Sequence, residues 1–165
     1  MICAGIDAGS RAVKAVLFDA AEMRVLGESV LDQGVQQDRT AAAAMDALLG
    51  SRGLARGDVR RVVATGYARN IVEFADTTIT EITCHASGVR HVMPAARTVI
   101  EIGGQDSKLL RLNEQGKVRD FAMNDRCAAG TGRFLEMVAG KLEVPLHALG
   151  ELAATASNPA AISSM

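Results

Sequence analysis

The chain has 165 residues, of which 48% are hydrophobic and 22% are charged, and this composition excludes an intrinsically disordered protein. The net charge of -1 gives no electrostatic reason to expect nucleic acid or an acidic membrane surface as a partner. No apolar run approaches the roughly 18 residues of a membrane helix, the N-terminus lacks a signal-peptide pattern, and three cysteines make no disulfide framework, which predicts a cytoplasmic protein.

The first half of the chain predicts a β-meander followed by alternating helices and strands. Residues 2–20 alternate apolar and small residues up to Asp7, turn through Ala8-Gly9-Ser10 and resume as AVKAVLFD, which predicts a hairpin. The elements predicted next are a strand at 24–34, a helix at 40–53, a strand at 59–67, a short helix at 70–76 and a helix at 83–94. This order predicts an α/β fold in which helices pack on a mixed sheet.

At residue 97 the pattern restarts. Residues 98–125 predict three strands separated by glycine turns, as at the start of the chain. IDAGSRAVK (6–14) and IEIGGQDSK (100–108) align as an acid, a spacer and a glycine turn, and each ends in a lysine. We interpret this as an internal duplication, which makes residues 1–96 one domain and residues 97–165 the first part of a second, incomplete domain.

Two such turns facing each other across a cleft are suited to binding phosphate. Glycines let the backbone approach closely, and turn N–H groups point at the anion. Asp7 can hold Mg²⁺ through water, because Mg²⁺ prefers one or two carboxylates together with phosphate oxygens, and Asp106 can do the same or orient a water. The alternative is that each turn is an ordinary hairpin whose aspartate bonds locally.

The segment MNDRCAAGTGRFLE, residues 123–136, places Cys127 directly before a predicted helix. From spacing alone this cysteine is a buried small hydrophobe, a nucleophile or a metal ligand. Cys84 and His85 are adjacent, but one such pair provides too few ligands for a structural zinc site. Glu81, just ahead of that pair, is a candidate for positioning an attacking water.

The paired hairpins resemble the phosphate-1 and phosphate-2 loops of the actin, sugar-kinase and heat-shock chaperone ATPase superfamily. More narrowly, one ordered set of motifs resembles the ATPase activators of 2-hydroxyacyl-CoA dehydratases and the ATP-binding subunits of benzoyl-CoA reductase. The motifs are GIDAGSRAVK, ATGYARN, EITCHASG, VIEIGGQDSK and MNDRCAAGTGRFLE. The resemblance covers the whole chain and implies an actin-like (ribonuclease H-like) ATPase fold.

This resemblance also implies cofactors and partners. It implies ATP or ADP with Mg²⁺, and one [4Fe–4S] cluster shared at the interface of a homodimer or a heterodimer, with Cys127 as a ligand. The partner would be an acyl-CoA dehydratase or reductase, and the electron donor a ferredoxin or flavodoxin. A helix start behind Cys127 would stabilise thiolate and cluster through its free N–H groups.

The resemblance assigns further residues to the nucleotide and the cluster. The predicted cofactor-binding residues are Gly9, Ser10, Arg11 and Lys14 in the first turn, Gly103, Gly104, Gln105 and Asp106 in the second, and Gly130, Thr131 and Gly132 at the helix start. Asp7, Asp106 and Glu81 are the predicted catalytic residues. The last three positions would allow close approach of the helix start to the nucleotide or cluster, and plain helix capping explains them nearly as well.

One departure from the family pattern stands out. In the family the second cluster cysteine follows the segment that reads AISSM here, and neither Cys3 nor Cys84 is at a matching position. We therefore expect the chain to be an N-terminal fragment or a natural truncation. Two alternative functions stay open: a metabolite kinase of the same superfamily, and a truncated, non-catalytic subunit.

Overall fold

The computed structural model describes residues 1–161, which divide into two compact units. Unit 1 comprises Met1–Ile100 and Leu109–Ala122, and unit 2 comprises Glu101–Lys108 together with the described residues from Met123 onward. Within this described part of the chain, no helix combines the length and the apolar character that a membrane crossing requires. The division into duplicated domains at residue 96 stays a prediction.

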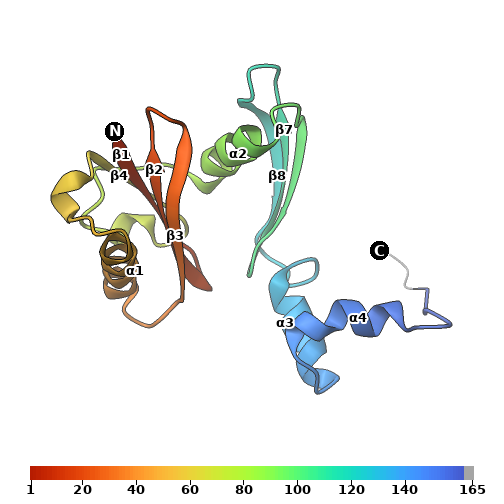
Figure 1. Ribbon diagram of the computed structural model, residues 1–165. Coiled ribbons are helices and arrows are strands. Elements are labelled where there is room, and N and C mark those ends of the chain that lie inside the picture. Colours follow the sequence, from red (N-terminus) through yellow and green to blue (C-terminus); the bar gives the residue numbers. More distant parts are fainter. Residues whose placement is uncertain (162–165) are drawn as a thin grey trace. The chain divides into compact units, whose positions relative to one another are not determined.

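A five-stranded mixed sheet forms the centre of unit 1 (Figure 1). Its strands are β1 (Ile2–Ala8), β2 (Ala12–Asp19), β3 (Arg24–Asp32), β4 (Arg61–Thr65) and β5 (Thr77–Thr78), in the order β3-β2-β1-β4-β5. The first three strands pair antiparallel, and β4 lies parallel to β1. The predicted β-meander at the start of a mixed α/β sheet is therefore confirmed.

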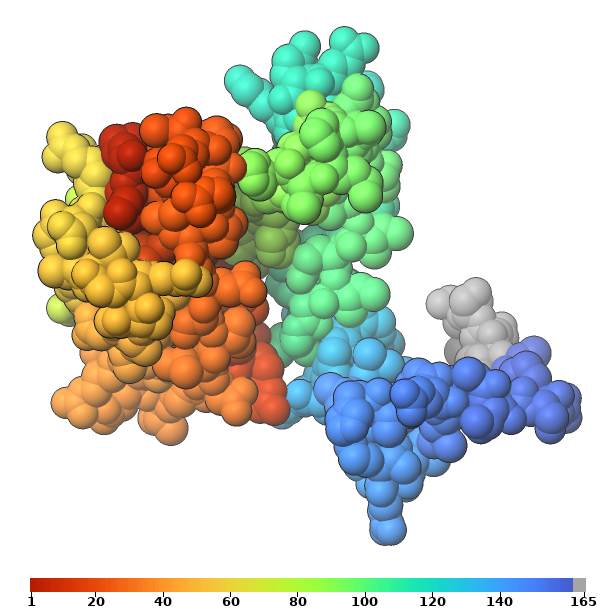
Figure 2. Space-filling model, in the orientation of Figure 1, coloured from red at the N-terminus to blue at the C-terminus, as the bar shows by residue number. Residues whose placement is uncertain are grey.

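Helix α1 (Gln37–Ser51) covers one face of this sheet (Figure 1). Because strand side chains alternate between faces, every second residue of β1 and β2 points into the core between sheet and helix. Ile6, Leu17 and Met45 are at most 1% exposed there, and burying a side chain of this size stabilises the fold by about 1.5–3 kcal/mol. Figure 2 shows this red-to-amber part of unit 1 closely packed.

The segment after β4 differs from the predicted short helix at 70–76. Only Arg69–Ile71 is helical, as one 3-10 turn. Residues 73–74 then form a turn, and β5 follows. The cause is the pairing of this segment with the sheet edge: the Asp76 carboxylate accepts the Val62 N–H at 2.7 Å, and the Asp76 N–H donates to the Val62 carbonyl at 2.9 Å. Val72, which lies between the 3-10 turn and β5, is buried in the core of unit 1. A helix through this segment would break both bonds.

Helix α2 (Glu81–Val92) begins two residues before its predicted start, because Thr80 caps it. The Thr80 hydroxyl accepts the Thr83 N–H at 3.4 Å, which satisfies one of the N–H groups that a helix start leaves without a partner. The helix contributes to a second hydrophobic cluster, which consists of Ala86, Val99, Leu110 and Leu112. The cluster joins α2 to the strands that follow it.

A second sheet begins where the sequence pattern restarts. It contains β6 (Thr98–Ile102), β7 (Ser107–Leu112) and β8 (Val118–Asn124), in that order. The remaining helical elements are η1 (Arg56–Asp58), α3 (Gly132–Lys141), η3 (Leu146–Ala148) and α4 (Leu149–Ala154). The Leu112 N–H donates to the Arg97 carbonyl and the Gly103 N–H to the Asp106 carbonyl, so β6 and β7 run antiparallel as a hairpin.

Candidate functional site

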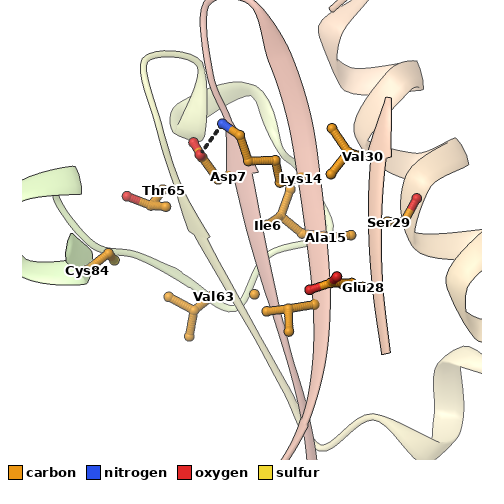
Figure 3. Close-up of a pocket in the computed structure, with 12 residues that line it drawn as sticks. Ile6, Asp7, Lys14, Ala15, Glu28, Ser29, Val30, Val63, Thr65 and Cys84 are labelled. Atoms are coloured by element: carbon orange, nitrogen blue, oxygen red, sulfur yellow. Dashed lines mark hydrogen bonds and ion pairs between the residues drawn. The ribbon is translucent and has the colours of Figure 1, made fainter. Parts of the chain in front are cut away.

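The first glycine turn closes the hairpin between β1 and β2. The Gly9 N–H donates to the Ala12 carbonyl at 3.2 Å, and Asp7 lies directly opposite Lys14 in the strand pairing. The Lys14 Nζ donates to Asp7 Oδ2 at 2.8 Å, as the dashed line in Figure 3 shows. Ser10 and Arg11 form the tip of the turn. The lysine side chain is 52% exposed, so this ion pair is accessible to solvent and to a ligand.

Gly66 explains the ATGYARN motif, whose role could not be derived from the sequence. Its φ is +94°, and a Cβ there would lie 2.5 Å from Asp7 Oδ1 and from the carbonyl group of Ala8. The Ala68 N–H donates to the Ala8 carbonyl at 2.9 Å. The turn after β4 is therefore packed against the end of β1, and only glycine fits this position. A glycine near the end of the strand predicted at 59–67 was the available signal.

A cavity of about 350 Å³ lies on the sheet face opposite α1, within unit 1. Gly5, Val16 and Val63 belong to its apolar lining, and Asp7, Lys14 and Thr65 add polar groups (Figure 3). The Thr65 hydroxyl is buried and without a hydrogen-bond partner among the described residues. Because a buried polar group without a partner is costly, this hydroxyl is suited to binding a water or a ligand atom.

The second glycine turn repeats the first with one added carboxylate. The Gly103 N–H donates to the Asp106 carbonyl at 2.8 Å, as Gly9 does to Ala12. The Lys108 Nζ contacts Glu101 Oε2 at 3.1 Å and Asp106 Oδ2 at 2.8 Å. Asp106 thus stands where the first turn has an alanine, and Glu101 stands where it has Asp7. The duplication inferred from the aligned motifs has the same turn bond and the same ion pair in both copies.

The two hairpins differ in how deeply their lysine is buried. The Lys108 side chain is 3% exposed, whereas its two carboxylate partners are 23% and 30% exposed. A Cβ on Gly103 would lie 2.6 Å from Asp106 Oδ1, so a side chain there would displace the carboxylate. Sequence reasoning singled out Asp106 and missed Glu101, although the alignment with Asp7 pointed to it.

Helix α3 begins directly on this second turn. The Gly132 N–H donates to the Gly103 carbonyl at 2.8 Å, and the Arg133 N–H donates to the Gly104 carbonyl at 2.9 Å. The expectation that N–H groups at this helix start are free to stabilise a thiolate is therefore wrong for these two residues, because the loop carbonyls take them. Thr131, the residue before the helix, is 1% exposed and donates its hydroxyl to the Ala128 carbonyl at 2.6 Å.

Cys127 is exposed in unit 2, in the loop between β8 and α3. Gly130 in the same loop has φ +76°, a conformation that favours glycine. Cys3 and Cys84 are partly buried and belong to unit 1. Within residues 1–161 there is no group of three or more histidine, cysteine or acidic side chains placed to hold a metal ion.

The other predicted residues are divided between the two units. Glu81 lies in the first turn of α2 in unit 1, and its predicted catalytic role stays a prediction. Gln105 lies beside Gly104 at the tip of the second turn in unit 2. Of the AISSM segment, residues 162–165 lie outside the described residues.

Comparisons with known proteins identify relatives along the whole chain. A model of the BadF/BadG/BcrA/BcrD ATPase family matches residues 4–165. The chain is 42% identical to the 2-hydroxyisocaproyl-CoA dehydratase activator of Clostridioides difficile, covering 99% of this chain and 61% of that protein. It is 36% identical to one of the subunits of benzoyl-CoA reductase from Thauera aromatica, over 99% of this chain and 59% of that one.

A solved structure gives the same result for the fold. The activator of the 2-hydroxyisocaproyl-CoA dehydratase from Clostridium difficile with bound ADPNP superposes with a TM-score of 0.90 at 40% identity, covering 99% of this chain and 60% of that chain. The chain therefore spans about three fifths of the length of these relatives.

Proposed function

Because the chain belongs to the BadF/BadG/BcrA/BcrD ATPase family and has the actin-like ATPase fold, we propose that it is part of an ATP-dependent activator of an acyl-CoA dehydratase or reductase. The observation that carries this proposal is the duplicated hairpin, in which an acid, a glycine turn and a lysine recur with the same turn bond and ion pair. The two relatives named above are a dehydratase activator and part of a reductase, which supports either class of partner.

The glycine turns are the proposed phosphate-binding elements. The backbone N–H groups at the tips of the turns, those of Ser10 and Arg11 in the first and of Gly104 and Gln105 in the second, would donate to phosphate oxygens of ATP. The absence of a side chain at Gly104 lets the anion approach the backbone closely. The ADPNP in the solved relative supports a nucleotide at such a site.

Asp7 is the proposed carboxylate for Mg²⁺, which it would hold through water, and Asp106 would either do the same or orient a water. Each has a lysine ammonium within 2.8 Å, so neither carboxylate presents an isolated charge. Since the described residues contain no cluster of three potential metal-binding side chains, phosphate oxygens and water would supply most of the ion's ligands. This is the coordination that Mg²⁺ prefers, and the residues present fit it.

Cys127 is the proposed ligand of a [4Fe–4S] cluster shared between two subunits. Its exposure suits a site at a surface between chains, and it provides one thiolate where such a cluster takes four. The described residues thus fit a shared site and make up only part of it. When bound, the cluster would supply the single low-potential electron that passes to the partner enzyme, with a ferredoxin or flavodoxin as donor.

The contact between the second turn and α3 is the proposed route from nucleotide to Cys127. Because the first two N–H groups of the helix donate to the carbonyls of Gly103 and Gly104, a shift of the turn on phosphate binding must move or break these bonds. Thr131 joins the same helix start to the Cys127 loop. A nucleotide-dependent change of this kind is a switch between two discrete arrangements.

The test uses the intact gene product that carries this sequence, prepared without oxygen. We expect ATP hydrolysis that needs no hydroxyl substrate, and iron and sulfide bound at the dimer interface. Cys127→Ser should bind ATP and retain no iron, whereas Cys3→Ser, the matched control, should retain it. Iron retained by Cys127→Ser would overturn the ligand assignment. ATP turnover that requires a small hydroxyl compound would favour the metabolite kinase instead.

A further inference from the structure

We propose that Asn124 is a positioning residue for Cys127, one whose carboxamide holds the backbone of the cysteine on both sides. This inference rests on the proposed function, because it takes Cys127 as a ligand of the cluster. Asn124 is the last residue of β8, three positions before the cysteine. Sequence reasoning gave it no role.

Three hydrogen bonds carry the inference. Asn124 Oδ1 accepts the backbone N–H of Cys127 at 3.1 Å. Asn124 Nδ2 donates to the carbonyl oxygen of Cys127 at 2.8 Å and to that of Ala129 at 3.0 Å. One side chain therefore binds both backbone polar groups of the cysteine, and the thiol side chain is left exposed.

The chemistry of the carboxamide makes asparagine specific here. Two of the three partners of Asn124 are carbonyl oxygens and one is an N–H group, so the site needs a donor and an acceptor on one short side chain. Aspartate has the same shape but would place a carboxylate oxygen against the carbonyls of Cys127 and Ala129. Alanine would leave all three backbone groups without this partner.

The far end of the loop is held separately. Thr131 donates its hydroxyl to the Ala128 carbonyl at 2.6 Å, and its own N–H donates to the same carbonyl at 3.1 Å. The Cys127 loop is thus fixed at its β8 end by Asn124 and at its α3 end by Thr131. A cysteine held in this way loses little backbone freedom when it binds metal. Mutation of residues that orient metal ligands typically lowers metal affinity 10- to 100-fold.

The experiment compares variants of the intact gene product, prepared without oxygen and loaded with iron and sulfide. The readouts are the rate at which a ferrous chelator removes iron, and the hydrogen exchange of the Cys127 amide in metal-free protein. Asn124→Ala should release iron about tenfold faster and exchange the Cys127 amide faster. Asn124→Asp should also release iron faster, while its remaining oxygen keeps an acceptor for that amide.

Asn113→Ala is the matched control, because Asn113 accepts the Lys117 N–H at 2.9 Å in the turn between β7 and β8. It loses the same kind of side-chain bond away from the cysteine and should release iron at the parental rate. Parental iron release by both Asn124 variants overturns this inference alone. A parent protein that binds no iron overturns the proposed function, and this inference with it.

Discussion

The backbone N–H of Gly132 donates to the carbonyl oxygen of Gly103 at 2.8 Å, so helix α3 starts on the glycine turn between β6 and β7. A Cβ on Gly132 would lie 3.2 Å from that carbonyl oxygen and 3.3 Å from the Cα of Gly104. Both neighbours are backbone atoms, which yield less readily than the end of a flexible side chain. A side chain at this position would therefore strain the contact that joins turn and helix.

Two glycines in this one helix allow a matched test. Gly→Ala inside a helix normally stabilises by about 0.5–1 kcal/mol, and Gly140, where a Cβ would meet open space, should follow this rule. Gly132→Ala should instead destabilise by about 1–2 kcal/mol, because the methyl group pushes the helix off the turn. Urea unfolding of both variants measures the two signs. Equal stabilisation by both substitutions would contradict the contact.

The two lysines of the duplicated hairpins should differ sharply in their effect on stability. Lys108→Met leaves Glu101 and Asp106 facing each other without their shared, buried cation, and should destabilise by about 2–4 kcal/mol. Lys14→Met removes a half-exposed pair with Asp7 and should cost less than about 1 kcal/mol. The urea midpoints of the two variants measure this difference. Equal losses of stability would contradict the conclusion that burial makes the Lys108 ion pairs more important than that of Lys14.

Gly66→Ala should be among the most destabilising substitutions in unit 1. The positive φ costs an alanine about 1–2 kcal/mol, and the contacts at 2.5 Å with Asp7 and Ala8 add about 1–3 kcal/mol. Gly57→Ala is the control, since a Cβ there meets nothing within 4 Å, and it should stay within about 0.5 kcal/mol of the parent. Thermal unfolding compares them. A small loss of stability in Gly66→Ala would mean that the turn after β4 can move away from the end of β1.

Stability in acid should depend on Asp76. The Val62 N–H that donates to Asp76 Oδ2, with Arg61 beside it, holds the pKa of this carboxyl below its usual value of 3.8. Because the folded pKa is the lower one, the stabilisation is present above the unfolded pKa and is lost as pH falls through the folded value.

The measurement is urea unfolding of the parent and Asp76→Asn at pH 7 and in steps below pH 4. The parent should be the more stable protein at pH 7, and the gap should shrink in acid. Asp46→Asn, which weakens an exposed ion pair with Arg56 at 2.8 Å, serves as the control and should show only a small difference throughout. A gap for Asp76→Asn that is constant with pH would contradict the role given to its charge.

Local pattern was enough to predict the larger strands and helices up to α2, the second set of three strands and the two glycine turns, but not β5 or α4. Alternating residues in β1 and β2, the glycine at each turn and the alanine-rich run of α1 are properties of neighbouring residues, and each was found where expected. The equivalence of Lys14 and Lys108 could also be predicted from the sequence. The two aligned hairpins have equal length, so in each one the lysine at the end lies opposite the acid at the start. The family followed from motifs that are short and continuous.

Contacts between distant segments could not be predicted in this way. The absence of a helix at 72–76 follows from bonds of Asp76 to Val62, and the need for glycine at 66 follows from the approach of β1. The burial of Lys108 and the engagement of the α3 N–H groups depend in the same way on which segments pack together. Each of these features depends on interactions between residues that are far apart in the chain. Such interactions form only when folding brings the segments into contact.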